Sequence, residues 1–284
     1  MIFSETLLFG LITMLGWGLG DFLMKLAVDK FGTLRTQFVQ LIFGNIIGII
    51  LIYTFFPIPE FKWSLTLIFL FVPFCILNIG GVLTYTEAIR RGPLSLVAPI
   101  ASTYPIITAF LSVIFLKEAL TLLQWFAIFI VVVGVVSLTF SSLQKKASFS
   151  GIPIAFATSL MWGILFVLFK PIILQMGIVL PSLLTGFIGI AVVWMILIYR
   201  KEANIPKTFN RWLSLIFSVV VLGIAYPIFA IGMKVSNPAI ITTISSAFPA
   251  VIVLLSVIFL KEKLHRWQII GIVTVLIGMA ILGQ

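Results

Sequence analysis

A seven-residue segment, SVIFLKE, occurs twice in this chain, at residues 112–118 and again at residues 256–262. The copies begin 144 positions apart (256 − 112) in a chain of 284 residues, so the second half repeats the first. Further pairs recur at nearly the same spacing: Thr13 with Thr158, Trp17 with Trp162, Lys25 with Lys170, Gly32 with Gly177, Pro105 with Pro249 and Gln124 with Gln268. We therefore predict two related domains, residues 1–146 and 147–284, built from copies of one unit.

The composition restricts the solvent in which that unit can fold. Hydrophobic residues make up 62% of the chain and charged residues 9%, with a mean hydropathy of +1.28. Too few charges remain to cover a water-exposed surface, so we predict a multi-pass protein of the cell membrane, with the lipid bilayer as a partner. The net charge of +10 is spread over short connectors, where it suits anionic headgroups, and forms no patch for nucleic acid.

The apolar runs have the length of membrane-spanning helices and lack the period of two that strands show. Pro, Gly and charged residues divide them into ten predicted helices, at about residues 4–28, 36–56, 63–89, 93–116, 121–141, 150–174, 178–199, 211–235, 238–260 and 266–283. We predict an all-α integral membrane protein of ten transmembrane helices. Five helices per repeat is an odd number, which would insert the second repeat upside down. The glycine pairs Gly16/Gly20 and Gly44/Gly48 are predicted to allow close helix contact.

The even number of helices places both termini on the same side of the membrane. Basic residues are concentrated in the odd-numbered connectors, for example Arg200, Lys201 and Lys207. By the positive-inside rule these connectors would face the cytoplasm, and both termini would then lie outside.

Several repeated motifs resemble a known group of membrane proteins. Each half has an early Trp-Gly with a Lys eight residues after the Trp (Trp17–Lys25, Trp162–Lys170). Each then has a polar break leading into a helix with a central Pro (Gly92–Pro105, Asn237–Pro249), followed by Phe-Leu-Lys-Glu. In this order and repetition the motifs resemble the drug/metabolite transporter superfamily, and most of all its ten-helix EamA type.

The resemblance implies a basket of ten helices whose central cavity is lined mainly by helices 1, 3, 4, 6, 8 and 9. It also implies that the cargo is a small metabolite such as an amino acid, nucleoside, sugar, amine or drug. This chain departs from the pattern in two respects. Members typically have Gly-Glu where this chain has Lys117-Glu118 and Lys261-Glu262. Members also usually keep both termini in the cytoplasm, whereas the basic residues of this chain would place both termini outside.

The first predicted helix carries one polar stripe, formed by Thr13, Trp17, Asp21 and Lys25. These residues are four apart, so they lie along a single inclined row on the helix surface. The sixth helix repeats the row except that Phe166 replaces Asp21. The acid therefore belongs to one half only, and such asymmetry suits a path for a substrate with one charged end.

A charge at membrane depth is costly, so Asp21 should find a partner, and Lys25 is one turn away. Two interpretations remain open: the pair neutralises itself, or Asp21 binds a substrate amine or a coupling proton. Glu87 is a second acid, but Arg90 and Arg91 are close enough in sequence to pair with it.

Two further groups of residues are candidates for substrate binding. Aromatic side chains in helices assigned to the cavity could hold an organic cation or a planar molecule, namely Trp17, Tyr85, Tyr104, Trp162 and Tyr226. Prolines interrupt helices 4 and 9 at equivalent points, where Ser102 and Ser246 either line the cavity or satisfy their own backbone.

These features predict a secondary transporter that moves a small metabolite by alternating access, with no phosphate-binding loop for ATP. A lipid-carrier flippase is one alternative. A membrane-embedded enzyme is less favoured, because one His in a connector and one Cys in an apolar run give little with which to build a catalytic or metal site. We expect no cofactor. The substrate, the direction of transport, the coupling ion and the choice between monomer and homodimer are left open.

Overall fold

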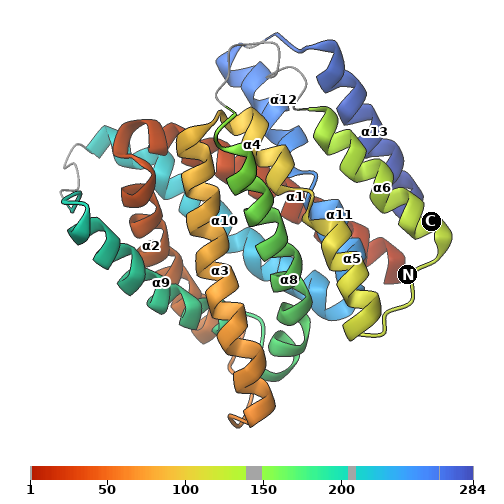
Figure 1. Ribbon diagram of the computed structural model, residues 1–284. Coiled ribbons are helices and arrows are strands. Elements are labelled where there is room, and N and C mark those ends of the chain that lie inside the picture. The colour runs from red at the N-terminus through yellow and green to blue at the C-terminus, as the bar shows by residue number, and fades with distance from the viewer. Residues whose placement is uncertain (1, 139–148, 204–208, 262, 284) are drawn as a thin grey trace.

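The structure is a computed structural model that describes residues 2–138, 149–203, 209–261 and 263–283 (Figure 1). In these ranges the regular structure is entirely helical. The first half contains α1 (Ile2–Phe31), α2 (Thr33–Thr54), α3 (Leu65–Arg91), α4 (Leu94–Ala101), α5 (Tyr104–Phe115) and α6 (Leu122–Ser137). The second half contains α8 (Ile152–Met176), α9 (Leu180–Tyr199), α10 (Phe209–Val235), α11 (Pro238–Ser245), α12 (Phe248–Leu260) and α13 (Arg266–Leu282).

These helices confirm the predicted ten spans. The pairs α4–α5 and α11–α12 are each one span with a two-residue break, and eight helical segments are long and apolar enough to cross a membrane. The remaining apolar helices, α6 and α13, have 16 and 17 described residues. The predicted end of the fifth span, at residue 141, lies outside the described residues.

The two halves repeat each other in backbone detail. Gly32 and Gly177 both have φ of 81°, directly after α1 and α8. The first helical turns of α6 and α13 carry the same capping box, in which Thr121 pairs with Gln124 and His265 pairs with Gln268. The only histidine of the chain thus accepts a hydrogen bond from the Trp267 amide at a helix start.

The halves also interlock. Helix α1 packs along α10, and in the same way α8 packs along α3. The first helix of each repeat therefore packs against the third helix of the other repeat. The equivalent helices α2 and α9 pack on each other, as do α6 and α13. Figure 1 shows the α2–α9 pair and the α6–α13 pair at opposite sides of the bundle, with α3, α10 and α8 between them. A central space is therefore bounded by both halves.

Glycine allows the closest of these contacts. A side chain at Gly16 or Gly20 would overlap Ala225 or Leu222 of α10, as predicted for the first glycine pair. The prediction is wrong for Gly44, where a Cβ atom would have no neighbour within 4 Å because this residue faces a cavity.

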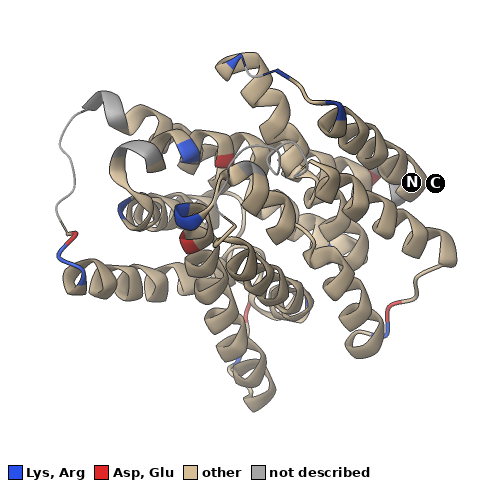
Figure 2. Cartoon of the chain, turned by 45° about the horizontal axis from the view of Figure 1, so that its top comes forward, with Lys and Arg blue, Asp and Glu red and all other residues tan. Residues whose placement is uncertain are grey.

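The outer surface suits lipid. Large apolar side chains such as Leu122, Phe69 and Phe259 are exposed along the helices. Figure 2 shows the charged residues mainly at helix ends and in connectors, while the sides of the helices are largely free of them. This distribution is the one expected of helices in a bilayer.

Candidate functional site

A cavity of about 220 Å³ lies in the centre of the bundle, and we call it the aromatic cavity. It receives side chains from α1, α2, α3, α5, α8, α10 and α12, hence from both halves. It is lined by Trp17, Asp21, Met24, Gln37, Gln40, Asn78, Val82, Tyr85, Tyr104, Trp162, Leu165, Phe166, Leu222, Tyr226 and Phe248. All five aromatic candidates and Asp21 thus meet at one place, although they are spread over more than 200 positions of sequence.

The rings contact one another around this space. Tyr85 packs against Trp162 with ring centroids 5.1 Å apart, and Tyr104 lies 5.0 Å from Phe166. Trp17 stacks near Phe166 at 6.3 Å with an interplanar angle of 20°. Aromatic contacts therefore join α1, α3, α5 and α8 into one wall, which holds each ring in a fixed orientation.

Asp21 is the acid of this wall. Its Oδ2 atom accepts a hydrogen bond of 3.1 Å from the Tyr85 hydroxyl. Within the described residues the ion pairs join Glu87 to Arg90 and Arg91 and Lys170 to Glu118, so Asp21 has no basic partner there.

The interpretation that Asp21 is neutralised by Lys25 is therefore wrong for this conformation. Lys25 lies at a separate small cavity of about 60 Å³, beside Pro99, Pro249 and Gln268. Four residues advance a helix by roughly 40° beyond a full turn, which here directs the two side chains into different spaces.

The two serine candidates lie outside the aromatic cavity. Ser102 and Ser246 end α4 and α11, where each hydroxyl donates to a carbonyl of its own helix, at Ala98 (2.7 Å) and Thr243 (2.8 Å). They satisfy carbonyl groups at the breaks. Pro105 and Pro249 lie in the first turns of α5 and α12, where no helical N–H bond is lost.

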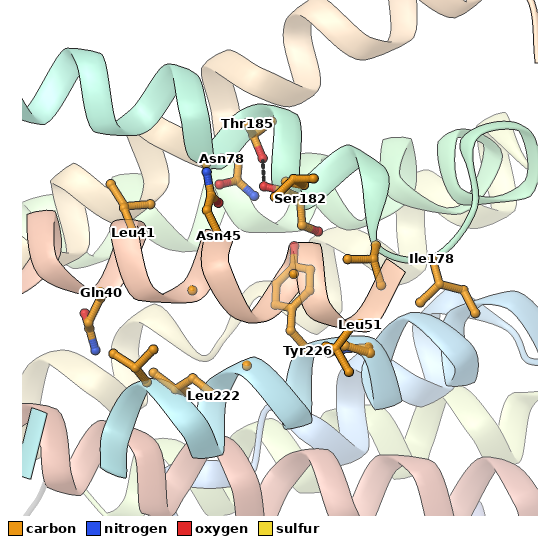
Figure 3. Close-up of a pocket in the computed structure, with 18 of the residues that line it drawn as sticks. Gln40, Leu41, Asn45, Leu51, Asn78, Ile178, Ser182, Thr185, Leu222 and Tyr226 are labelled. Atoms are coloured by element: carbon orange, nitrogen blue, oxygen red, sulfur yellow. Dashed lines mark hydrogen bonds between the residues drawn. The ribbon is translucent and has the colours of Figure 1, made fainter. Parts of the chain in front are cut away.

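A second cavity, of about 260 Å³, adjoins the first between α2, α9 and α10. The two share Gln37, Gln40, Asn78, Leu222 and Tyr226. We call it the amide cavity, because its polar lining residues are mostly side-chain amides and hydroxyls: Gln37, Gln40, Asn45, Asn78, Ser182, Thr185 and Tyr226. Figure 3 shows the Tyr226 hydroxyl pointing toward the side where Asn45, Asn78 and Ser182 lie.

Asn45 is the most enclosed amide of this group. It is 7% exposed, and its Nδ2 atom has no hydrogen-bond partner among the described residues. Gly186 of α9 makes room for it, since a Cβ atom at residue 186 would overlap the Asn45 amide. A buried donor without a partner is costly and marks a place where a ligand or water would be stabilised.

These amides are not among the site residues predicted from the sequence. A signal was available, because Gln37, Gln40 and Asn45 stand in one apolar helix and Asn78 in the next. The resemblance directed attention to other helices, yet α2 supplies three of the polar side chains.

The fold and the cavities together define a multi-pass membrane protein with an internal repeat and a central binding space. The profile of the EamA-like transporter family matches residues 5–140 and 149–284, so almost the whole chain is covered by two copies. The chain belongs to the EamA-like transporter family.

The chain is also similar to several individual proteins. An uncharacterised protein of Methanocaldococcus jannaschii is 32% identical over 145 residues, which is 49% of this chain and 99% of the relative, so that protein has about the length of one repeat. An uncharacterised transporter of Archaeoglobus fulgidus is 23% identical over 71% of this chain and 70% of its own. A crystal structure with 18% identity superimposes with a TM-score of 0.77, covering 98% of this chain and 96% of the other, and shows the same fold.

Proposed function

We propose that this protein is a secondary transporter that moves a small metabolite across the cell membrane by alternating access. One observation carries the proposal: two adjoining cavities lie between the repeats and are lined by both, and one of them contains Asp21, an acid without a basic partner among the described residues. An ionisable side chain at membrane depth that lines a cavity is typical of a substrate or ion pathway.

We propose that residues 1–146 and 147–284 form the two repeats, inserted in opposite orientations. The interlocked packing of α1 with α10 and of α8 with α3 supports this arrangement. Movement of one repeat against the other would then change the walls of the central space. Trp17, Asp21, Tyr85, Tyr104, Trp162 and Tyr226 are the proposed substrate-binding residues.

Flux across liposomes tests the proposal. The purified protein would be reconstituted, and uptake of a mixture of amines, amino acids, nucleosides and sugars followed by mass spectrometry. Accelerated uptake after preloading with the same compound is the expected result, because alternating access exchanges substrates one for one. Lipid transfer between leaflets in the same vesicles would instead support the flippase alternative.

A matched pair of variants separates flux through the cavity from leakage. Val82→Trp places a large ring in the aromatic cavity, whereas Val72→Trp lies on the same helix at an exposed position. Flux should disappear in the first variant and persist in the second, with both proteins equally monodisperse. Equal flux through both variants would refute transport through this cavity.

A further inference from the structure

Resting on the proposed transport function, we infer that the substrate is an organic cation with an uncharged, hydrogen-bonding tail. Its cationic group lies in the aromatic cavity beside Asp21, and its tail extends into the amide cavity. The two compartments adjoin through Gln37, Gln40, Asn78, Leu222 and Tyr226, so one elongated molecule can occupy both.

The charge of the site selects the cation. Asp21 lines the aromatic cavity, and Tyr85 donates the one hydrogen bond it receives from another side chain in the described part of the chain. A tyrosine hydroxyl supplies a dipole and no counter-charge. A positively charged ligand would provide the opposite charge that the surrounding residues do not.

The rings around Asp21 favour the same class of ligand. Trp17, Tyr85 and Trp162 line the cavity together with Tyr104, Phe166 and Phe248. Their electron-rich faces attract organic cations, above all quaternary ammonium groups, which have no N–H to donate and depend on such faces. The ring contacts already described hold this wall in place without the ligand, so little ordering would be needed on binding.

The same lining disfavours acids and zwitterions. Among the described residues that line the two cavities there is no Lys, Arg or His. A carboxylate or phosphate on the substrate would lose its hydrating water without gaining a cationic partner. This desolvation cost disfavours anionic substrates more strongly than a poor steric fit would. An ordinary amino acid would satisfy Asp21 with its amine and leave its carboxylate unpaired.

The lining of the amide cavity indicates the chemistry of the substrate's tail. The Asn45 Nδ2 group is buried and has no described partner, and Gln37, Gln40 and Asn78 offer further donors and acceptors. Neutral donors and acceptors of this kind match hydroxyl, carbonyl or amide groups and add no charge of their own. Figure 3 shows Asn45 and Asn78 on one side of this space and Gln40 farther along the same helix as Asn45.

Three probes of nearly the same shape separate the possibilities. Choline carries a quaternary ammonium and a hydroxyl, dimethylbutanol is its uncharged carbon isostere, and glycine betaine has a carboxylate in place of the alcohol group. Binding to the purified full chain in detergent would be measured by calorimetry. We expect choline to bind at least tenfold more tightly than either of the others.

Variants assign the two compartments. Asp21→Asn should weaken choline binding at least tenfold, whereas Glu5→Gln, an exposed acid on the same helix, should not change it. Asn45→Leu should leave tetramethylammonium binding unchanged and weaken a trimethylammonium compound with a short amide-terminated chain by roughly three- to tenfold, the loss of about one hydrogen bond.

The possible results are distinct from those of the transport test. Equal affinity for choline and dimethylbutanol, or unchanged choline binding by Asp21→Asn, would overturn the cation assignment even if other compounds cross the membrane. Choline binding without any exchange flux would support the cation site and refute transport. Tighter binding of betaine than of choline would show that the cavity accepts zwitterions, and would also overturn the inference.

Discussion

Lys117 and Lys261 end α5 and α12 with the same left-handed backbone, with φ of 55° and 54°. This conformation brings the Glu118 amide to the Ser112 carbonyl (3.3 Å) and closes the last turn. A residue with a side chain pays about 1–2 kcal/mol to adopt it, whereas Gly does not. This is the physical reason why the family resemblance leads one to expect Gly at both positions.

Replacing either lysine with glycine should therefore stabilise the protein. We expect Lys117→Gly to raise the free energy of unfolding by roughly 0.5–1 kcal/mol, because removal of the strain outweighs the greater freedom of the unfolded chain. Lys117 is exposed, so loss of its side chain costs little packing. Thermal unfolding in detergent is the measurement. Lys117→Ala keeps the strain and should show no gain; an equal gain there would contradict the explanation.

Asp21 and Lys25 are the second test at the residue scale. Asp21→Asn should abolish substrate exchange while the protein still folds and inserts, because Asp21 pairs with Tyr85 and faces the aromatic cavity. Adding Lys25→Met should not restore exchange, since Lys25 lies at a different cavity. Flux in liposomes is the readout. Wild-type flux in the double variant would contradict the proposal, because it would show that transport does not require Asp21.

At the scale of elements, the backbones of α6 and α13 approach each other closely at glycine residues. A Cβ atom at Gly134 would lie 2.8 Å from the Val275 nitrogen and 2.9 Å from the Gly271 oxygen, and one at Gly271 would lie 2.7 Å from the Gly134 oxygen. Backbone atoms cannot move aside as side chains can. The pairing therefore requires Gly on both helices.

Gly134→Ala should destabilise the protein by roughly 1–3 kcal/mol, because the helices must separate to admit the methyl group. Gly44→Ala is the matched control, since its Cβ would meet nothing within 4 Å and alanine favours a helix. Thermal unfolding should thus move in opposite directions for the two variants. A loss of stability in both would indicate a general intolerance of Ala.

At the scale of the whole molecule, Lys170 ties three elements together. From α8 its ammonium reaches the Glu118 carboxylate beyond α5 (2.6 Å) and the Ser236 carbonyl after α10 (2.9 Å). Both side chains of the pair are mostly buried, so removing one partner leaves the other poorly solvated. The repeat makes Lys25 its counterpart, and Lys25 has no ion pair with a described residue. The ion pair and the hydrogen bond therefore join the ends of α5, α8 and α10 at one end of the bundle.

Breaking this connection should loosen that end. In a Cys75→Ala background, the Asn78→Cys substitution would report access to both cavities. We expect Lys170→Met to speed its reaction with a water-soluble thiol reagent several-fold. Lys234→Met removes an exposed lysine of α10 and should leave the rate unchanged. Identical rates in both variants would show that the ion pair closes nothing.

The sequence alone determined the local features of this protein. The ten spans, the repeat, the breaks near Pro105 and Pro249 and the paired start signals at Gln124 and Gln268 were all predictable. Each depends on residues near one another in the chain: the length of an apolar run, a proline without an N–H, or a cap three residues from its partner. The pairing of Glu87 with Arg90 and Arg91, one turn apart, was predictable for the same reason.

The lining of the cavities depends on how the helices pack against one another in three dimensions. The rotation of each helix could not be predicted from sequence, so Lys25 was expected beside Asp21. Packing of α1 near α3 instead brings the Tyr85 hydroxyl to Asp21. The amides of α2 likewise had no predicted role, because they form a site only together with α9 and α10. Helix rotation and pairing depend on many weak contacts between distant residues, such as Gly186 with Asn45, and on no local signal.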